Sequence, residues 1–126
     1  FMKINKKTLN SKKLSQLIIE SLENDKAINI KTINLLNRSS LADYMIVASG
    51  SSTRQVGSMS QNLIKKLKNN GIKSRKPEGL SNSDWVLIDA NEIIVHLFRP
   101  EVREFYKLEQ MWEIPILHDS KSKYLS

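Results

Sequence analysis

The loop Gly50-Ser51-Ser52-Thr53 could do chemistry because it joins an apolar strand, MIVAS, to a segment with helical spacing. Helix N-termini present free N–H groups and a positive dipole end, so this junction would suit a phosphate. The loop matches neither a P-loop nor a dinucleotide fingerprint, since it holds one glycine and lacks a Gly-Lys-Ser/Thr ending. Ser52 and Gln55 also have the spacing of a capping box, which explains the serine without a ligand.

Metal or acid–base chemistry would need carboxylates or histidines close together. Asp84, Asp89 and Glu92 are the candidates for magnesium, but the first two fall on opposite faces of a strand, and the chain has no Asp-x-Asp or Asp-x-Glu pair. His96 and His118 are the two histidines, and no nucleophile-elbow spacing places a serine beside either. Because cysteine is also absent, we expect no catalytic residue, no metal and no cofactor. A nucleotidyltransferase-like enzyme using the serine-rich turn stays the enzymatic alternative.

Eight elements that would position these residues follow from the hydrophobic periodicity, in the order α-β-β-α-β-β-β-α. We predict a helix capped by Ser11 after a polar lead-in, strands over 28–36 and 44–48, a helix from Ser52 to Gly71, an edge strand over 73–79, a hairpin of strands 85–89 and 92–98, and a helix from Pro100. This order predicts one α/β domain over 2–117, with a mixed sheet of about five strands and helices packed on it. We expect a flexible tail over 118–126, and Phe1 to be a leftover of expression.

The hairpin carries most of the information about function. A two-residue loop at Ala90-Asn91 would place six side chains on one face, in the pairs Asp89 with Glu92, Leu87 with Ile94, and Trp85 with His96. The opposite face is entirely aliphatic and must be core. The mixed face is typical of a protein-binding patch, unless a helix covers it and buries the tryptophan. Periodicity alone leaves both readings open.

Charge is divided unevenly along this chain of net charge +7. Residues 1–77 carry 15 Lys/Arg and 4 Asp/Glu, whereas residues 78–113 carry 3 and 8. The asymmetry favours a partner with a basic surface, such as one surrounded by nucleic acid, over a partner that is uniformly anionic. The alternative is that the charges only keep the surface solvated. No apolar run approaches the roughly 20 residues that span a bilayer, so we expect a cytoplasmic protein without membrane contact.

Three segments, ADYMIVASGSSTRQV, EGLSNSDWVLIDANEIIVHLF and EVREFYKLEQMW, follow one another between Ala42 and Trp112. Together they resemble the ribosomal silencing factor family, also called RsfS or Iojap-like. The resemblance implies an α/β fold related to that of nucleotidyltransferases. It also implies that the protein has no catalytic activity, because the family is not known for catalysis. It also implies binding to large-subunit ribosomal protein fourteen, a block of subunit joining and lower translation under nutrient limitation. Organelle relatives assist assembly of the large subunit, which is the alternative role.

Functional residues follow from two sources, the positions that match the family and the mixed face of the predicted hairpin, which adds Leu87, Glu92 and Ile94. The partner-binding residues that we predict are Trp85 as the anchor, Leu87 and Ile94 around it, His96, and the acceptors Glu78, Asp89 and Glu92. A second, polar set would either brace the sheet or face the partner, and consists of Asp43, Arg103, Tyr106 and Glu109. The other matching positions are Gly50, Ser51, Arg54, Gly79, Glu101 and Trp112. The lysine-rich N-terminus and the tail after Pro115 would either touch nearby ribosomal RNA or have no role, and a homodimer of the free protein is a further possibility.

Overall fold

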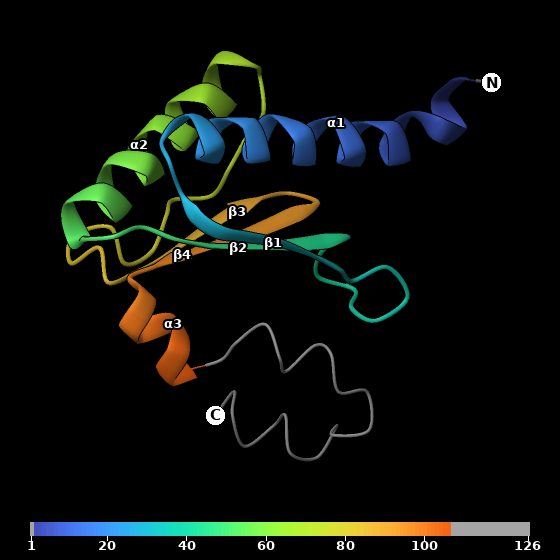
Figure 1. The fold of residues 1–126 in the computed structure, drawn as a ribbon. Helices are drawn as coiled ribbons and strands as arrows, with labels where there is room; N and C mark the ends of the chain where they lie inside the picture. The colour runs from blue at the N-terminus through green and yellow to red at the C-terminus, as the bar shows by residue number, and fades with distance from the viewer. Residues whose placement is uncertain (1, 107–126) are drawn as a thin grey trace.

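The computed structural model of this protein describes the backbone of residues 2–106 and the side chains of residues 11–103. Figure 1 shows a four-stranded sheet with two helices on one side and a short helix on the other. In chain order the elements are α1 (Met2–Asn24), β1 (Ile28–Asn34), β2 (Tyr44–Ser49), α2 (Thr53–Asn69), β3 (Trp85–Ala90), β4 (Ile93–Phe98) and α3 (Pro100–Tyr106). None of the helices in this part of the chain has both the length and the hydropathy that crossing a membrane would require.

The sheet is mixed, and its strand order is β1-β2-β4-β3. The central strands β2 and β4 pair in parallel, whereas β1 and β3 pair antiparallel on the two sides. A parallel pair requires a crossover connection, and the segment containing α2 and β3 supplies it. The fold class predicted from the sequence is therefore confirmed, with four strands in place of about five.

The main core lies between the sheet and the helices α1 and α2. The side of α2 that faces the sheet carries Val56, Met59, Leu63 and Leu67 on successive turns, and all four are fully buried. The aliphatic face of the hairpin meets them, as predicted, with Val86, Ile88, Ile93, Val95 and Leu97 fully buried. Burial of each such side chain contributes about 1.5–3 kcal/mol, so this layer holds the sheet in place.

Helix α1 is longer than predicted, because it begins at Met2 and not at Ser11. The lead-in contains neither proline nor glycine, so nothing in it interrupts the helical conformation. Ser11 is not a cap; it is buried, and its hydroxyl donates a 2.7 Å hydrogen bond to Asp43 Oδ2. Ser11 therefore makes a tertiary contact that joins α1 to Asp43, where the local sequence had predicted a helix cap.

The edge strand predicted over 73–79 is wrong. Only one bridge forms there, in which the backbones of Glu78 and Leu87 exchange hydrogen bonds of 3.0 and 2.9 Å. Pro77 has no N–H to donate, and Gly79 has a φ of +84°, which turns the chain away from an extended path. The segment lies along β3 without becoming a fifth strand.

The hairpin exists, but its loop is one residue further along than predicted. Ala90 pairs with Ile93, so the loop is Asn91-Glu92, and Asn91 adopts a φ of +67°. Asparagine tolerates this left-handed conformation at little cost, and its place fixes the register. The cross-strand pairs therefore become Asp89–Ile94, Leu87–His96 and Trp85–Phe98.

Helix α3 follows β4 directly and begins at Pro100, as predicted. Val102 packs against the second core cluster, which includes Phe98 of β4 and Met45 and Val47 of β2. The rest of the predicted apolar stripe of this helix, its end at Pro115 and the tail over 118–126 lie outside the described residues.

Candidate functional site

The hairpin face is the side of β3 and β4 that points away from α1 and α2. It consists of Trp85, Leu87, Asp89, Ile94, His96 and Phe98. The corrected register places Phe98 opposite Trp85 on this face and leaves Glu92 in the loop. Figure 1 shows α3 on this side of the sheet, below the end of β4.

Three rings form the centre of the hairpin face. Trp85 Nε1 donates a 3.0 Å hydrogen bond to His96 Nδ1, and its ring lies 5.2 Å from the ring of Phe98. The rings of His96 and Phe98 stack 6.0 Å apart, and Phe98 is fully buried. Burial lowers the pKa of His96 to about 4. The histidine is therefore neutral near pH 7, accepts through Nδ1 and fixes the orientation of the indole.

A hollow of about 360 Å³ opens on this face, lined by Glu78, Gly79, Trp85, Leu87 and His96. The Glu78–Leu87 bridge brings the preceding segment over the edge of β3 to form one wall. Gly79 is required here, since a Cβ would collide with the carbonyl oxygen of Trp85 and its φ is positive. The hollow can receive an apolar side chain, with a carboxylate at its border.

The predicted acidic residues are distributed around the hairpin face. Glu78 is exposed, and Asp89 is half-buried with Oδ2 at 3.6 Å from Arg75 Nε. Asp89 Oδ1 also accepts from the backbone N–H of Asn91 at 3.1 Å, which steadies the turn. Glu92 is half-buried in the loop, where its carbonyl accepts from Asp43 N at 2.7 Å.

Two residues of the polar set brace the fold. Arg103 is 9% exposed, and its guanidinium donates to Ser49 Oγ at 3.1 Å, which ties α3 to β2. Asp43 holds α1 through Ser11. The side chain of Tyr106 and the whole of Glu109 lie outside the described residues, so their predicted roles stay predictions.

The serine-rich loop is built as a helix cap. Ser52 Oγ accepts from Gln55 N at 3.1 Å, which confirms the first half of the capping box. Gln55 Oε1 accepts from the backbone N–H of Ser51 at 2.6 Å, and Gly50 N donates to Phe98 O at 3.0 Å. A Cβ on Gly50 would lie 2.9 Å from Val56 Cγ2, which accounts for the glycine. The N–H groups of Gly50, Ser51 and Gln55 thus have acceptors within the protein.

The candidate metal ligands do not converge. Asp84 forms an ion pair with Arg99, with 2.9 Å between Oδ1 and Nε, while Asp89 faces Arg75 on another part of the strand. Among the described residues, no three carboxylates or histidines lie close enough to share an ion.

Sequence reasoning missed two contributors to the hairpin face, Phe98 and Arg75, and it singled out Gly79 without a role at the hollow. A loop placed one residue later would have paired Phe98 with Trp85, and the preference of Asn91 for positive φ was the available signal. No local signal could have paired Arg75 with Asp89, since the contact depends on a segment that is not a strand.

A small α/β domain with a hollowed, mixed face on its hairpin has the features of a binding module. The family model described as "Ribosomal silencing factor during starvation" matches residues 8–124. The chain therefore belongs to the ribosomal silencing factor family, as its sequence motifs indicated.

Individual relatives agree with this assignment. The "Ribosomal silencing factor RsfS" of Zymomonas mobilis is 50% identical over 108 residues, which cover 86% of this chain and 81% of that protein. A crystal structure of a Chromobacterium violaceum protein superimposes with a TM-score of 0.79 at 37% identity, covering 81% of this chain and 85% of that one. The mouse protein "Mitochondrial assembly of ribosomal large subunit protein 1" is 31% identical over 106 residues, which cover 82% of this chain and 46% of that protein.

Proposed function

We propose that this protein is a ribosomal silencing factor that binds the large ribosomal subunit and blocks its joining to the small subunit. Its contact is large-subunit ribosomal protein fourteen, a basic protein embedded in ribosomal RNA, and the outcome is lower translation in the cytoplasm under nutrient limitation. The mechanism is steric occlusion, which needs neither turnover nor a cofactor. Membership of the silencing factor family and the names of its relatives support the general role.

The observation that carries the choice of surface is the hollow beside Trp85. The indole is half-buried and held by His96 and Phe98, so it is already in one orientation before a partner arrives. A rigid aromatic anchor loses little conformational entropy on binding, and such anchors dominate many interfaces. Leu87 and Ile94, both half-buried, provide apolar area around it.

The charges around the hairpin face suit a basic partner. Glu78 and Asp89 border it and can accept hydrogen bonds from lysine or arginine. Exposed charges at the border of an interface mainly raise the rate and the specificity of association, while the apolar centre supplies affinity.

The test is sedimentation of the purified protein with dissociated ribosomal subunits. We expect the wild type to migrate with the large subunit and to reduce the amount of joined ribosomes. The Trp85→Ala variant should lose about 2 kcal/mol of binding free energy, or about thirty-fold in Kd, because it removes the anchor.

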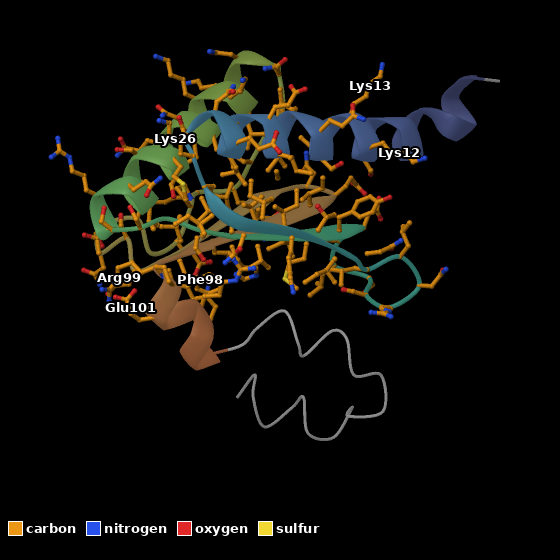
Figure 2. The ribbon with its side chains drawn as sticks, viewed as in Figure 1. Lys12, Lys13, Lys26, Phe98, Arg99 and Glu101 are labelled. Atoms are coloured by element: carbon orange, nitrogen blue, oxygen red, sulfur yellow. The ribbon has the colours of Figure 1, made fainter. Side chains whose placement is uncertain are left out.

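Lys13→Ala is the matched control, since Lys13 is exposed on α1 and far from the hairpin face (Figure 2). Leu87→Glu is the second variant, because it places a charge at the hollow without removing the indole–imidazole contact. Circular dichroism establishes that each variant is folded. If folded Trp85→Ala and Leu87→Glu both bind like the wild type, the hairpin face is not the interface.

A role in large-subunit assembly is the second candidate, favoured by the name of the mouse relative. An assembly factor would use the same surface but prefer immature particles. Comparing affinities for mature subunits and for precursor particles isolated from cells separates the two roles. A second copy of the chain docked on the hairpin face would compete with either particle, so light scattering of the free protein belongs to the same series.

A further inference from the structure

Basic residues gather in one stretch of the chain. Residues 44–77 contain no aspartate or glutamate and seven lysines and arginines. Six of them belong to the last turns of α2 and to the segment that follows it. We name this group the basic border, which consists of Lys65, Lys66, Lys68, Lys73, Arg75 and Lys76.

The fold places the second half of the basic border, Lys73, Arg75 and Lys76, beside the hairpin face, whereas the lysines of α2 belong to a helix that packs on the opposite side of the sheet. After α2 ends, Ile72 N bonds to Leu67 O at 2.9 Å, which turns the chain back toward the sheet. The segment then follows the outer side of β3, where Arg75 N donates to Asp89 O at 3.1 Å and Glu78 bridges Leu87. The basic residues therefore lie immediately before the residues that line the hollow.

Most of this charge is turned to solvent. Lys65, Lys68, Lys73 and Lys76 are exposed, and among the described residues none of the four is within ion-pair distance of a carboxylate. Arg75 is the exception, because it faces Asp89. Like charges gathered in one place repel each other and destabilise the compact state slightly. A polyanion that binds these lysines neutralises their charge and releases its own counterions, and this release raises its affinity for the protein.

We propose that the basic border binds the phosphate backbone of ribosomal RNA while the hairpin face binds protein. The identity of the RNA rests on the proposed function; the charge and position of the border come from the chain itself. The carboxylates of Glu78 and Asp89 repel phosphates, so RNA is directed to the border and away from the hollow. The carboxylates at the hairpin face and the basic segment along its edge then define a single orientation on a basic protein surrounded by RNA.

The test compares two triple variants that remove the same charge. Lys68→Gln, Lys73→Gln and Lys76→Gln together neutralise part of the border. Lys12→Gln, Lys13→Gln and Lys26→Gln together are the control, on α1 and just beyond it (Figure 2). Each protein is titrated against large subunits over a range of KCl concentrations, and against isolated large-subunit ribosomal protein fourteen without RNA.

Each lysine that contacts a phosphate adds about 0.7–0.9 to the slope of log K against log salt. The border variant should therefore show a shallower slope by about 2 and a roughly ten-fold weaker affinity for the subunit at low salt. Its affinity for the isolated ribosomal protein should equal that of the wild type. The control variant should behave as the wild type in both titrations.

Three results of these titrations would overturn the inference: equal salt slopes for the border variant and the wild type, equal losses in the border and control variants, or a matching loss with the RNA-free protein. The last would mean that the border contacts protein. Failure of the proposed function looks different, because the wild type itself would then bind neither the subunit nor the isolated ribosomal protein. A border variant that loses binding to anionic vesicles, but not to subunits, would identify a lipid partner and also overturn the inference.

Discussion

At the scale of single residues, His96 decides how the hairpin face is organised. Sequence alone offered it as an isolated histidine on a strand, and the structure shows an uncharged acceptor that holds Trp85 through a 3.0 Å hydrogen bond. Its 9% exposure makes the charged form unfavourable, since neither water nor a carboxylate compensates for burial. The histidine is thus a positioning residue for the anchor.

Protonation of His96 makes stability depend on pH. Its pKa is lowered from 6.5 to about 4 in the folded state, so between these values the unfolded chain binds more protons than the folded one. This contribution is complete above pH 6.5 and is lost as the pH falls toward 4, up to about 3 kcal/mol. Urea unfolding at several pH values measures it.

The His96→Gln variant removes this titration but keeps a side chain that can accept from the indole. We expect its stability to change less than that of the wild type between pH 6.5 and pH 4. Parallel curves for the two proteins would contradict the assignment, because all other titrating groups are common to both.

At the scale of elements, the junction between β2 and α2 resembles a phosphate site in its sequence, but its side chains form a helix cap. Ser52 caps the first turn, and Gln55 bonds back to Ser51 and reaches the carbonyl of Asp25 at 3.0 Å. One side chain therefore joins the cap of α2 to the end of α1. The loop is explained by the contacts between helices.

Ser52→Ala removes the acceptor for Gln55 N and should lower the free energy of unfolding by about 1 kcal/mol. Thermal or urea denaturation measures the difference. Ser58→Ala is the control, since Ser58 is exposed in the middle of the same helix and alanine favours that position. Equal effects of the two substitutions would show that the cap contributes nothing.

At the scale of the whole molecule, charge is arranged by position on the surface. Glu78 and Asp89 lie at the hairpin face, and the basic segment that follows α2 runs beside them, with Arg75 facing Asp89. A partner of mixed charge, basic protein beside RNA, would meet both signs at once. This arrangement speeds correctly oriented encounters more than it adds affinity.

Glu78→Lys reverses an exposed charge beside the hollow and should slow association with large subunits by about three- to ten-fold at low salt, with less effect on dissociation. The difference should shrink as KCl is added, since salt screens exposed charges. Stopped-flow or surface-based kinetics measure both rates. Glu20→Lys, at an exposed position of α1, makes the same change in net charge and should leave the association rate as in the wild type.

Local patterns in the sequence were sufficient to predict those features of the structure that depend on residues close together in the chain. The α2 stripe of Val56, Met59, Leu63 and Leu67, its serine cap and the aliphatic face of the hairpin follow from periodicity, because helix and strand repeats dictate which side chains share a face. The resemblance of three segments to one family was also determined at this level.

Only the tertiary structure decided what depends on residues far apart. Ser11 bonds to Asp43 across 32 positions, and Arg103 to Ser49 across 54, so neither role could be predicted locally. The register of the hairpin depends on which residue takes the left-handed conformation, and a shift of one loop position makes Phe98, in place of His96, the cross-strand partner of Trp85. Such choices come from packing energies summed over the whole core, which no window of sequence contains.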